Sequence, residues 1–417
     1  MDREVVIVMV PFPIQGHLNQ LLQLACLLSS TYDLPVYYVV SATHNQQARF
    51  HDIPTHELAL PPPDFNALSK ISHYGITSFL RDISSKSRRL IVVHDFFMSY
   101  SVQDVSSLLN AESYRFNCIS AFTLYCSSYL FSGMFVQLGE KLLKKLPSLE
   151  GAMPDEVKNF IALQSPYMDI RTGDIHNTSK IIEHGFLDLL AQVESKQQWA
   201  INPTLPTKLN HISNRNNICL EWLEKQPRRS ILYISFGTST TFSDGEVMEF
   251  KPIRVDIFTG EARKHVFPEG FEERVKGVGL LVREWAPQPD ILPHSSTGGF
   301  MSHCGWNSCI ESITMGVPIA AWPMRSDQPV NSFLVMEILK IGLFVREREK
   351  LEELVSASTI ENVVRKLMAF EDGDAIRKRA EELGEAVRRS TEKGGASRME
   401  LDSLIAHHKI RVAFHQK

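Results

Sequence analysis

Two histidines occupy positions from which an imidazole could do chemistry near neutral pH. His17 lies in PFPIQGHLNQ, directly after an apolar run that predicts a buried strand, and His303 begins HCGWNSCIES, directly after another. Open α/β sheets bind their ligands at the carboxyl ends of strands, where both histidines are expected. Because the pKa of histidine suits proton transfer from a hydroxyl group, His17 is a candidate general base. A lone histidine after a strand is otherwise a helix cap or a surface residue.

The segment HCGWNSCIES supports two interpretations. Its strand ends in a turn at Gly305, and a helix is expected to begin near Asn307. The first turn of a helix offers unpaired N–H groups and a partial positive charge, which favour a phosphate, and His303 would add a hydrogen bond. In the alternative, Asn307 is only an N-cap, and Ser308 and Glu311 form a capping box. The local pattern leaves both interpretations open.

The elements around these histidines alternate in type. Short runs rich in Val and Ile predict buried strands, and segments of helical period lie between them, as in a parallel sheet covered by helices. In the first half, strands are expected at residues 4–10, 36–40, 90–94 and 116–119, and helices at 18–28 and 100–109. In the second half, strands are expected at 230–237, 279–285, 298–304 and 318–323, and helices at 219–226, 307–315, 330–340 and in the charged tail at 356–407.

Length and a linker-like stretch divide the chain into two domains. Its 417 residues exceed what one hydrophobic core usually supports. The polar stretch PTLPTKLNHISNRNN, residues 203–217, contains the Asn and Pro residues typical of linkers. We therefore expect an N-terminal domain at residues 1–202, a C-terminal domain at 218–392 and a C-terminal helical tail at 393–417.

Charge, cysteines and hydropathy exclude several classes of partner. Lys and Arg number 44 against 48 Asp and Glu, and the net charge of -4 argues against nucleic acid and anionic membranes as partners. The six cysteines form no CxxC pair, which indicates free thiols in a reducing compartment. The N-terminal apolar run is too short for a signal peptide, and no later segment suits a membrane span. We expect a cytoplasmic monomer.

A longer pattern surrounds the second histidine. Residues 285–328 read WAPQPDILPHSSTGGFMSHCGWNSCIESITMGVPIAAWPMRSDQ. From the opening WAPQ through HCGWNS and GVP to the closing DQ, this segment resembles the signature box of the plant UDP-dependent glycosyltransferases of family 1. The resemblance implies an α/β fold of the GT-B type, in which two Rossmann-like domains face a cleft. It also implies that the N-terminal domain binds the acceptor and the C-terminal domain binds a UDP-sugar.

The resemblance assigns a role to each matched position of the C-terminal domain. Trp285 would stack on uracil, because a flat indole suits a flat base, and Ala286 and Gln288 would lie beside it. The Glu311 carboxylate would accept the ribose hydroxyl groups. Three residues would face the sugar and four would lie beside the diphosphate. The first group is Trp306, Asp327 and Gln328, and the second is Thr238, His303, Asn307 and Ser308.

The same family places its catalytic histidine in the PxxxQGH context that contains His17. A carboxylate on the second imidazole nitrogen would hold the tautomer and stabilise the imidazolium. The candidate for this partner is Asp104, in the helix expected after the strand LIVVHD, where the resemblance places an aspartate. Asp95, at the end of that strand, is the competitor. The interval between the two aspartates is one residue longer than is usual for the family.

Neither a metal ion nor another cofactor is expected. The N-terminus of the second-half helix and His303 would neutralise the leaving diphosphate. The only DxD pattern, at Asp372 and Asp374, lies in a charged loop and is interpreted as a helix cap. The loop after the first strand lacks GxGxxG, which argues against a nucleotide-dependent oxidoreductase.

Within the family, the chain is most similar to the zeatin O-glucosyltransferases. The similarity is visible in QGHLNQLLQLA, VVHDFFMSYSVQDV and SDQPVNS. It implies that glucose passes from UDP-glucose to a hydroxyl group of a small acceptor, a cytokinin such as zeatin, with inversion at the anomeric carbon. His17 would be the base, and the aspartate would orient it. A closing Gln, here Gln328, is usual in family members that use glucose.

Three segments depart from the family pattern. After Phe250 the chain continues directly into KPIRVDIF, so that a helix is cut short and an apolar strand of the C-terminal domain is missing. Residues 45–89 are compressed where the family forms part of its acceptor pocket, and the C-terminal HHKIRVAFHQK is atypical. A lost strand would expose sheet edges and unpaired backbone groups. The alternative function is a non-catalytic nucleotide- or cytokinin-binding protein derived from such an enzyme by internal deletion.

Overall fold

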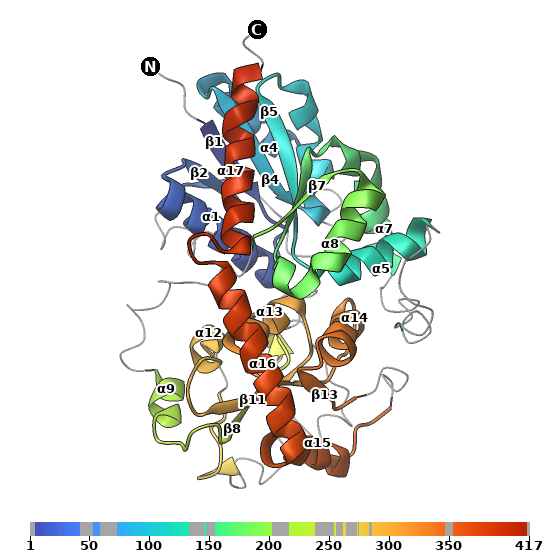
Figure 1. Cartoon of the computed structure of the whole chain (residues 1–417). Helices are drawn as coiled ribbons and strands as arrows, with labels where there is room; N and C mark the ends of the chain where they lie inside the picture. Colours follow the sequence, from blue (N-terminus) through green and yellow to red (C-terminus); the bar gives the residue numbers. More distant parts are fainter. Residues whose placement is uncertain are drawn as a thin grey trace. The chain divides into compact units, whose positions relative to one another are not determined.

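The described part of the chain forms two compact units (Figure 1). The computed structural model describes residues 5–41, 53–58, 73–132, 146, 155–201, 217–237, 254–255, 262–263, 273, 275–282, 286–346 and 353–414. As far as they are described, residues 1–128, 153–204 and 390–417 form the first unit, and residues 129–152 and 205–389 form the second. The chain passes from the first to the second after residue 204, in the stretch expected to be a linker, of which residues 203–216 lie outside the described residues.

The first unit is built on a seven-stranded sheet. Its strands are β1 (Val5–Val10), β2 (Val36–Ser41), β3 (Thr55–Leu58), β4 (Arg89–Asp95), β5 (Ala111–Asn117), β6 (Gly173–His176) and β7 (Gln197–Ala200). They stand in the order β3-β2-β1-β4-β5-β6-β7, and every neighbouring pair is parallel. The central strand β4 is buried along its whole length, as expected for a parallel sheet with covered faces.

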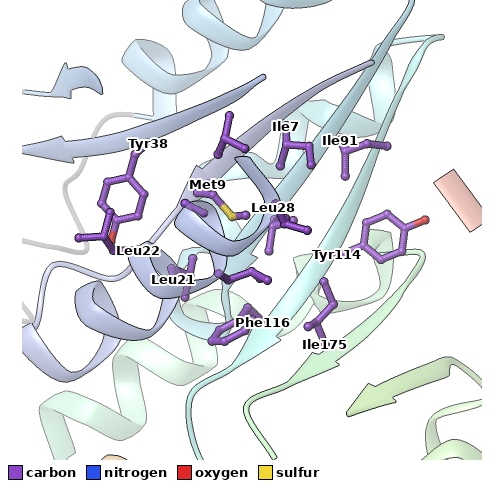
Figure 2. Packing of buried hydrophobic residues seen from close by; sticks show 14 of the residues in the cluster. Ile7, Met9, Leu21, Leu22, Leu28, Tyr38, Ile91, Tyr114, Phe116 and Ile175 are labelled. Atoms are coloured by element: carbon purple, nitrogen blue, oxygen red, sulfur yellow. The ribbon is translucent and has the colours of Figure 1, made fainter. Parts of the chain in front are cut away.

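Helices cover both faces of this sheet. They are α1 (Gln15–Tyr32), α4 (His73–Lys86), α5 (Ala121–Ser132), α7 (Asp155–Gln164), α8 (Lys180–Glu194) and α17 (Ala396–Phe414), with the 3-10 helices η2 (Phe96–Met98), η3 (Tyr100–Ser107) and η4 (Ser165–Ile170). Leu21 of α1 and Leu404 of α17 belong to the core on one face, part of which is shown in Figure 2. Leu80 of α4, Val102 of η3 and Phe160 of α7 belong to the core on the other.

The second unit contains a smaller parallel sheet. Its strands are β8 (Ile231–Ser235), β11 (Thr297–Ser302), β12 (Ile319–Ala321) and β13 (Gly342–Phe344), in the order β13-β12-β11-β8. A separate antiparallel pair consists of β9 (Arg254–Val255) and β10 (Ala262–Arg263). The helices are α9 (Ile218–Leu223), α12 (Gln288–Ile291), α13 (Trp306–Met315), α14 (Gln328–Phe333), α15 (Ala357–Ala369) and α16 (Glu371–Ser390), with the π-helical turn η6 (Leu334–Ile338).

Three expectations for individual elements need correction. The segment expected as an α-helix at 100–109 is the 3-10 helix η3, in which the hydroxyl groups of Ser106 and Ser107 each donate to a carbonyl three residues back. The strand expected at 116–119 begins earlier, as β5. Within the strand expected at 279–285, residues 279–282 are described, and of these only Gly279 pairs, in an isolated bridge with Lys276. A strand needs a neighbour, and among the described residues β8 pairs only with β11.

The C-terminal segment is part of the first unit's core. Leu401, Leu404 and Ile405 of α17 lie in the same apolar cluster as residues of β1, β4 and α1. Two strands of that sheet are therefore stabilised by a helix from the far end of the chain. Within the described residues, no helix has both the length and the apolar character needed to cross a membrane. All six cysteines are free thiols.

A buried carboxylate joins two helices of the first unit. Glu183 is 1% exposed and lies in α8, where the backbone departs from helical geometry (φ -131°, ψ 25°). Its two carboxylate oxygens accept from Ala121 N at 3.1 Å and from Phe122 N at 2.8 Å. These N–H groups belong to the first turn of α5, which has no intrahelical acceptors for them. Burial raises the pKa of Glu183 to about 7, although these hydrogen bonds oppose the rise.

Replacing Glu183 with Gln should change how stability depends on pH. The folded-state pKa of about 7 lies above the ordinary value of 4.5, so the wild-type protein should lose stability as the pH rises through this window. Gln does not titrate. As the pH rises from about 4.5 to about 7, the free energy of unfolding of the variant should therefore increase by about 3 kcal/mol relative to that of the wild-type protein. Thermal unfolding of both proteins at pH 5 and pH 8 measures this difference. Equal changes in the two melting temperatures would contradict it.

Candidate functional site

His17 lies at the carboxyl edge of the first unit's sheet. β1 ends at Val10, and α1 begins at Gln15, so that His17 is in the first turn of the helix. The centroid of its ring is 5.6 Å from that of Phe12 and 5.8 Å from that of Phe97. The side chain is 21% exposed. The imidazole is thus held among apolar rings and still reaches the surface of the unit.

The imidazole is hydrogen-bonded to a buried aspartate. His17 Nδ1 and Asp95 Oδ2 are 2.7 Å apart, and the Asp95 side chain is 1% exposed. Asp95 is the last residue of β4, which pairs in parallel with β1, and the register places His94 opposite Val10. The two segments that leave these strands are therefore neighbours at one edge of the sheet. This contact makes Asp95 the carboxylate that orients His17.

The choice of Asp104 as the partner of His17 was wrong. Asp104 lies in η3, which packs on the sheet together with α4, and its Oδ2 accepts from Thr77 Oγ1 at 2.6 Å. The physical reason is the geometry of parallel sheets. The end of a strand meets the ends of its neighbours, whereas a residue nine positions further along the chain has already moved onto a face of the sheet. Asp104 links η3 to α4 and does not orient the imidazole.

The Asp95 carboxylate accepts three hydrogen bonds. Besides the bond with His17, Phe97 N donates to Oδ1 at 2.9 Å and Cys118 Sγ donates to Oδ2 at 3.1 Å. Burial acts to raise the pKa of Asp95, but His17 and these donors outweigh it and leave the pKa below its ordinary value. The carboxylate is ionised at neutral pH and only accepts, so Nδ1 of His17 carries the shared proton. The lone pair of the neutral ring is then on Nε2, as a general base requires.

The same three side chains form the one cluster of possible metal ligands in the described part of the chain. Ligand atoms of His17, Asp95 and Cys118 lie within 4.8 Å of one another. Two ligands on one zinc ion, with bonds of about 2.0–2.3 Å, are roughly 3.3 Å apart or more. The observed separations of 2.7 Å and 3.1 Å are hydrogen-bond lengths. The cluster therefore fits a proton-transfer group better than a metal centre.

In the second unit, His303 follows β11 in a tightly constrained turn. Cβ atoms added to Gly237 and Gly305 would lie 2.7 Å and 2.5 Å from its Nε2, so both positions require glycine. Gly237 also has a positive φ of 71°. Cys304, between His303 and Gly305, adopts a left-handed φ of 63°, and its carbonyl accepts from Asn331 Nδ2 at 3.0 Å. The sequence placed a turn at Gly305 but did not identify Gly237, and it did not show that contact with His303 requires glycine at both positions.

The helix after this turn has no side-chain cap. α13 begins at Trp306 with Gly305 as the N-cap residue, and the cap has no side-chain hydrogen bond. The alternative in which Asn307 is the N-cap residue is therefore wrong. The capping-box alternative is also wrong, because Glu311 accepts instead from Gln288. The start of α13 carries the partial positive charge of a helix N-terminus, which suits an anion.

His303 is neutral at physiological pH. It is 7% exposed, and burial lowers its pKa to about 4, with a further lowering from the charge of Arg325. The ring can exchange hydrogen bonds but supplies no positive charge in this state. The expectation that His303 neutralises a diphosphate is therefore not supported, and the partial charge of the α13 N-terminus stands in its place.

Three of the residues assigned by the signature box meet in one polar group. Gln288 Nε2 donates to Glu311 Oε2 at 2.7 Å and to Ser308 Oγ at 3.2 Å. Gln288 begins α12, and the other two belong to α13. Burial raises the pKa of Glu311 to about 7, opposed by the hydrogen bond from Gln288. Ala286 packs against the core cluster around Cys219, and its carbonyl accepts from Gln288 N.

The closing residues of the box stabilise a loop before α14. Gln328 Oε1 accepts from Met324 N at 2.9 Å and from Arg325 N at 3.0 Å, which leaves its amide nitrogen as a donor. Asp327 Oδ2 accepts from Asn331 Nδ2 at 2.7 Å, and the same nitrogen donates to the turn at Cys304. This amide joins the loop to the turn that follows β11. Trp306 is buried, and Thr238 and Trp285 lie outside the described residues.

Two family patterns and several relatives match this chain. The family described as glycosyltransferase, N-terminal domain, matches residues 3–206, and the family described as UDP-glucoronosyl and UDP-glucosyl transferase matches residues 270–369. Zeatin O-glucosyltransferase of Phaseolus lunatus is 41% identical over 450 aligned positions, which include 97% of each chain. Zeatin O-xylosyltransferase of Phaseolus vulgaris is 40% identical, with 97% of this chain and 98% of the relative aligned.

The solved structures agree on the fold. A UGT transferase from Siraitia grosvenorii, in complex with UDP, matches with a TM-score of 0.77 at 26% identity, over 97% of this chain and 100% of that one. The GT-B type fold expected from the sequence is confirmed. The 450 aligned positions of the Phaseolus lunatus protein exceed the 417 residues here, so the relative has internal positions that this chain lacks. This chain belongs to the plant UDP-glycosyltransferase family and is a UDP-sugar-dependent glycosyltransferase.

Proposed function

We propose that the protein transfers glucose from UDP-glucose to the side-chain hydroxyl group of a cytokinin such as zeatin. The acceptor is supported by the similarity to zeatin O-glucosyltransferase, and Gln328 at the end of the signature box supports glucose as the sugar. The xylosyltransferase of nearly equal similarity makes UDP-xylose the competing donor. The 2.7 Å hydrogen bond between His17 and Asp95 carries the proposed mechanism, because it prepares an imidazole to act as a base.

In this mechanism His17 is the catalytic base. Its Nε2 takes the proton of the acceptor hydroxyl group as the hydroxyl oxygen attacks the anomeric carbon from the side opposite the nucleotide. The bond between the anomeric carbon and the diphosphate oxygen breaks in the same displacement, so the configuration inverts and UDP leaves. Asp95 is a positioning residue, which holds the ring and stabilises the imidazolium that forms.

The second unit supplies the donor site. Backbone N–H groups at the start of α13 bind the diphosphate, and the neutral His303 adds a hydrogen bond. Glu311 accepts the ribose hydroxyl groups once its carboxyl group is ionised. The remaining assignments follow the family. Trp285, Ala286 and Gln288 bind uracil, Thr238, Asn307 and Ser308 lie at the diphosphate, and Trp306, Asp327 and Gln328 face the sugar.

This assignment includes no metal ion and no cofactor besides the sugar donor. The partial charge at the start of α13 offsets part of the charge of the leaving diphosphate. We place the protein in the cytoplasm as a monomer, and the six free thiols support a reducing compartment.

A product assay tests the proposed function. Incubation of the protein with trans-zeatin and either UDP-glucose or UDP-xylose should yield zeatin O-glucoside as the main product by liquid chromatography and mass spectrometry. His17→Ala is the control and should abolish turnover. O-xyloside as the main product would overturn the sugar assignment. Binding of UDP-sugar by the folded protein without any product would favour the non-catalytic alternative.

The two aspartates should differ strongly in their effect on turnover. Asp95→Asn should lower kcat/KM on the order of a thousandfold, because an amide cannot stabilise the imidazolium and favours the wrong tautomer. Asp104→Asn should change kcat/KM by less than about threefold, because Asp104 bonds only to the neighbouring helix in the described contacts. Steady-state kinetics of both variants measures this contrast. A larger loss in Asp104→Asn than in Asp95→Asn would contradict the assignment.

Binding of UDP-glucose should strengthen as the pH rises from 6 to 8. The pKa of Glu311 is about 7 without ligand, and the ionised carboxylate accepts two hydroxyl groups better than the protonated form. The affinity should therefore increase about tenfold over this interval, and Glu311→Gln should remove most of the increase. Calorimetric titrations of both proteins at the two pH values measure it. The diphosphate of UDP-glucose does not titrate here, which makes it a better probe than UDP. Equal affinities of the wild-type protein at both pH values would count against this role of Glu311.

A further inference from the structure

The Asp95 oxygen that holds His17 has a second donor. Cys118 directly follows β5, and its Sγ lies 3.1 Å from Asp95 Oδ2, the same oxygen that His17 Nδ1 contacts at 2.7 Å. Cys118 is 6% exposed and belongs to the core cluster that contains α1 and β1. The thiol and the imidazole therefore share one carboxylate oxygen inside the first unit.

The thiol acts as a donor in this contact. Burial raises the pKa of Cys118 well above its ordinary value, and the charge of Asp95 raises it further, so the sulfur keeps its proton. A hydrogen bond to a carboxylate withdraws negative charge from the oxygen that accepts it. Less charge then remains to stabilise a protonated His17. An S–H group is a weak donor, so the effect is smaller than that of a hydroxyl group would be.

Among the described residues, few other ionisable groups surround the hydrogen-bonded pair of His17 and Asp95. The ionisable side chains that act on Asp95 or Cys118, directly or through one neighbour, are Cys26 of α1, Tyr38 of β2, His94 of β4, Arg115 of β5 and Arg171 before β6. Arg115 is engaged by Asp174 at 2.5 Å, and burial lowers the pKa of His94 to about 4. The Tyr38 hydroxyl group donates to Leu18 O. Burial raises the pKa values of Cys26 and Tyr38 and lowers that of His94, so these three groups keep their charge between about pH 5 and pH 8.

We propose that Cys118 is a positioning residue that sets the basicity of His17 by donating a hydrogen bond to the Asp95 oxygen that the two side chains share. This inference rests on the proposed function for its catalytic meaning, since it concerns the base of the same reaction. The thiol keeps His17 deprotonated over a wider pH range and so keeps the base ready. Cys118 does not touch the substrate in this account.

Substitution of the thiol tests the inference directly. In Cys118→Ala the shared oxygen loses a donor, so the pKa of His17 should rise by roughly half a unit or more. Cys118→Ser retains a donor, and a stronger one. The pKa of His17 in this variant should therefore equal the wild-type value or lie below it. The pKa of His17 is measured in the full-length protein by NMR titration of labelled histidine side chains. The His17 resonance is assigned from its absence in His17→Gln.

A second buried thiol provides the matched control. Cys126 of α5 is also 6% exposed, and its titration is linked to Glu183 instead of Asp95. Cys126→Ala should leave the pKa of His17 unchanged, although it removes the same sulfur from a buried position. A His17 pKa within about 0.2 units of wild type in Cys118→Ala would overturn the inference, as would an equal shift in Cys126→Ala. If Cys118→Ala does not fold, a His17 pKa in Cys118→Ser above that of wild type would also overturn it.

Kinetics separates this inference from the proposed function. With zeatin and UDP-glucose, the midpoint of the acidic limb of kcat/KM against pH should shift to higher pH in Cys118→Ala, by the same amount as the pKa of His17 in the NMR titration. In Cys118→Ser this midpoint should not shift to higher pH. Absence of product from the wild-type protein would contradict the proposed function, while the NMR titrations would still decide the role of Cys118. An unchanged acidic limb together with a shifted NMR titration would show that His17 is not the base.

Discussion

A buried carboxylate needs hydrogen-bond donors, and the first unit is arranged so that Asp95 has them. An isolated charge inside a protein is costly, so each of the two oxygens must be satisfied. The donors come from three places: the start of α1, the turn after β4 and the end of β5. The parallel sheet, in which β1, β4 and β5 are neighbours in that order, brings these segments to one edge. The imidazole of His17 is oriented as a result of that requirement.

In the second unit, the turn after β11 and the start of α13 lie at the carboxyl edge of the sheet. The N-terminus of α13, with Gly305 as its N-cap residue, carries a partial positive charge that favours a diphosphate. His303 fits against this turn because Gly237 and Gly305 have no Cβ atom. Its burial keeps it neutral, so it can contact an anion by hydrogen bonding without a charged imidazolium. The packing around His303 therefore sets its protonation state, and a neutral imidazole is limited to hydrogen bonding.

The correction from Asp104 to Asp95 shows where sequence reasoning reaches its limit. Both aspartates lie at or after the end of the same strand. The interval between them is one residue longer than is usual for the family, so the family spacing does not decide which aspartate is the partner of His17. The structure separates them because Asp95, the last residue of β4, lies beside the segment that follows the neighbouring strand β1, whereas Asp104 lies in η3 and bonds to Thr77. Cys118 was likewise not identified, since no motif marks a cysteine that follows a strand. Its contact with Asp95 is visible only in the tertiary structure.

Local pattern determined the elements and the chemistry that they carry. The apolar periodicity predicted the strands β1, β4 and β11 and the helices α1 and α13. The resemblance carried by the signature box and the QGH segment predicted the family, His17 and the donor residues. These features depend on neighbours in the chain, which a sequence displays directly. Tertiary structure alone decided which aspartate holds His17, which glycines make room for His303, and that α17 completes the core of the first unit from the other end of the chain. Apart from that of Gly305 with His303, these contacts join residues tens to hundreds of positions apart, and strand order and packing, which local pattern does not contain, set their geometry.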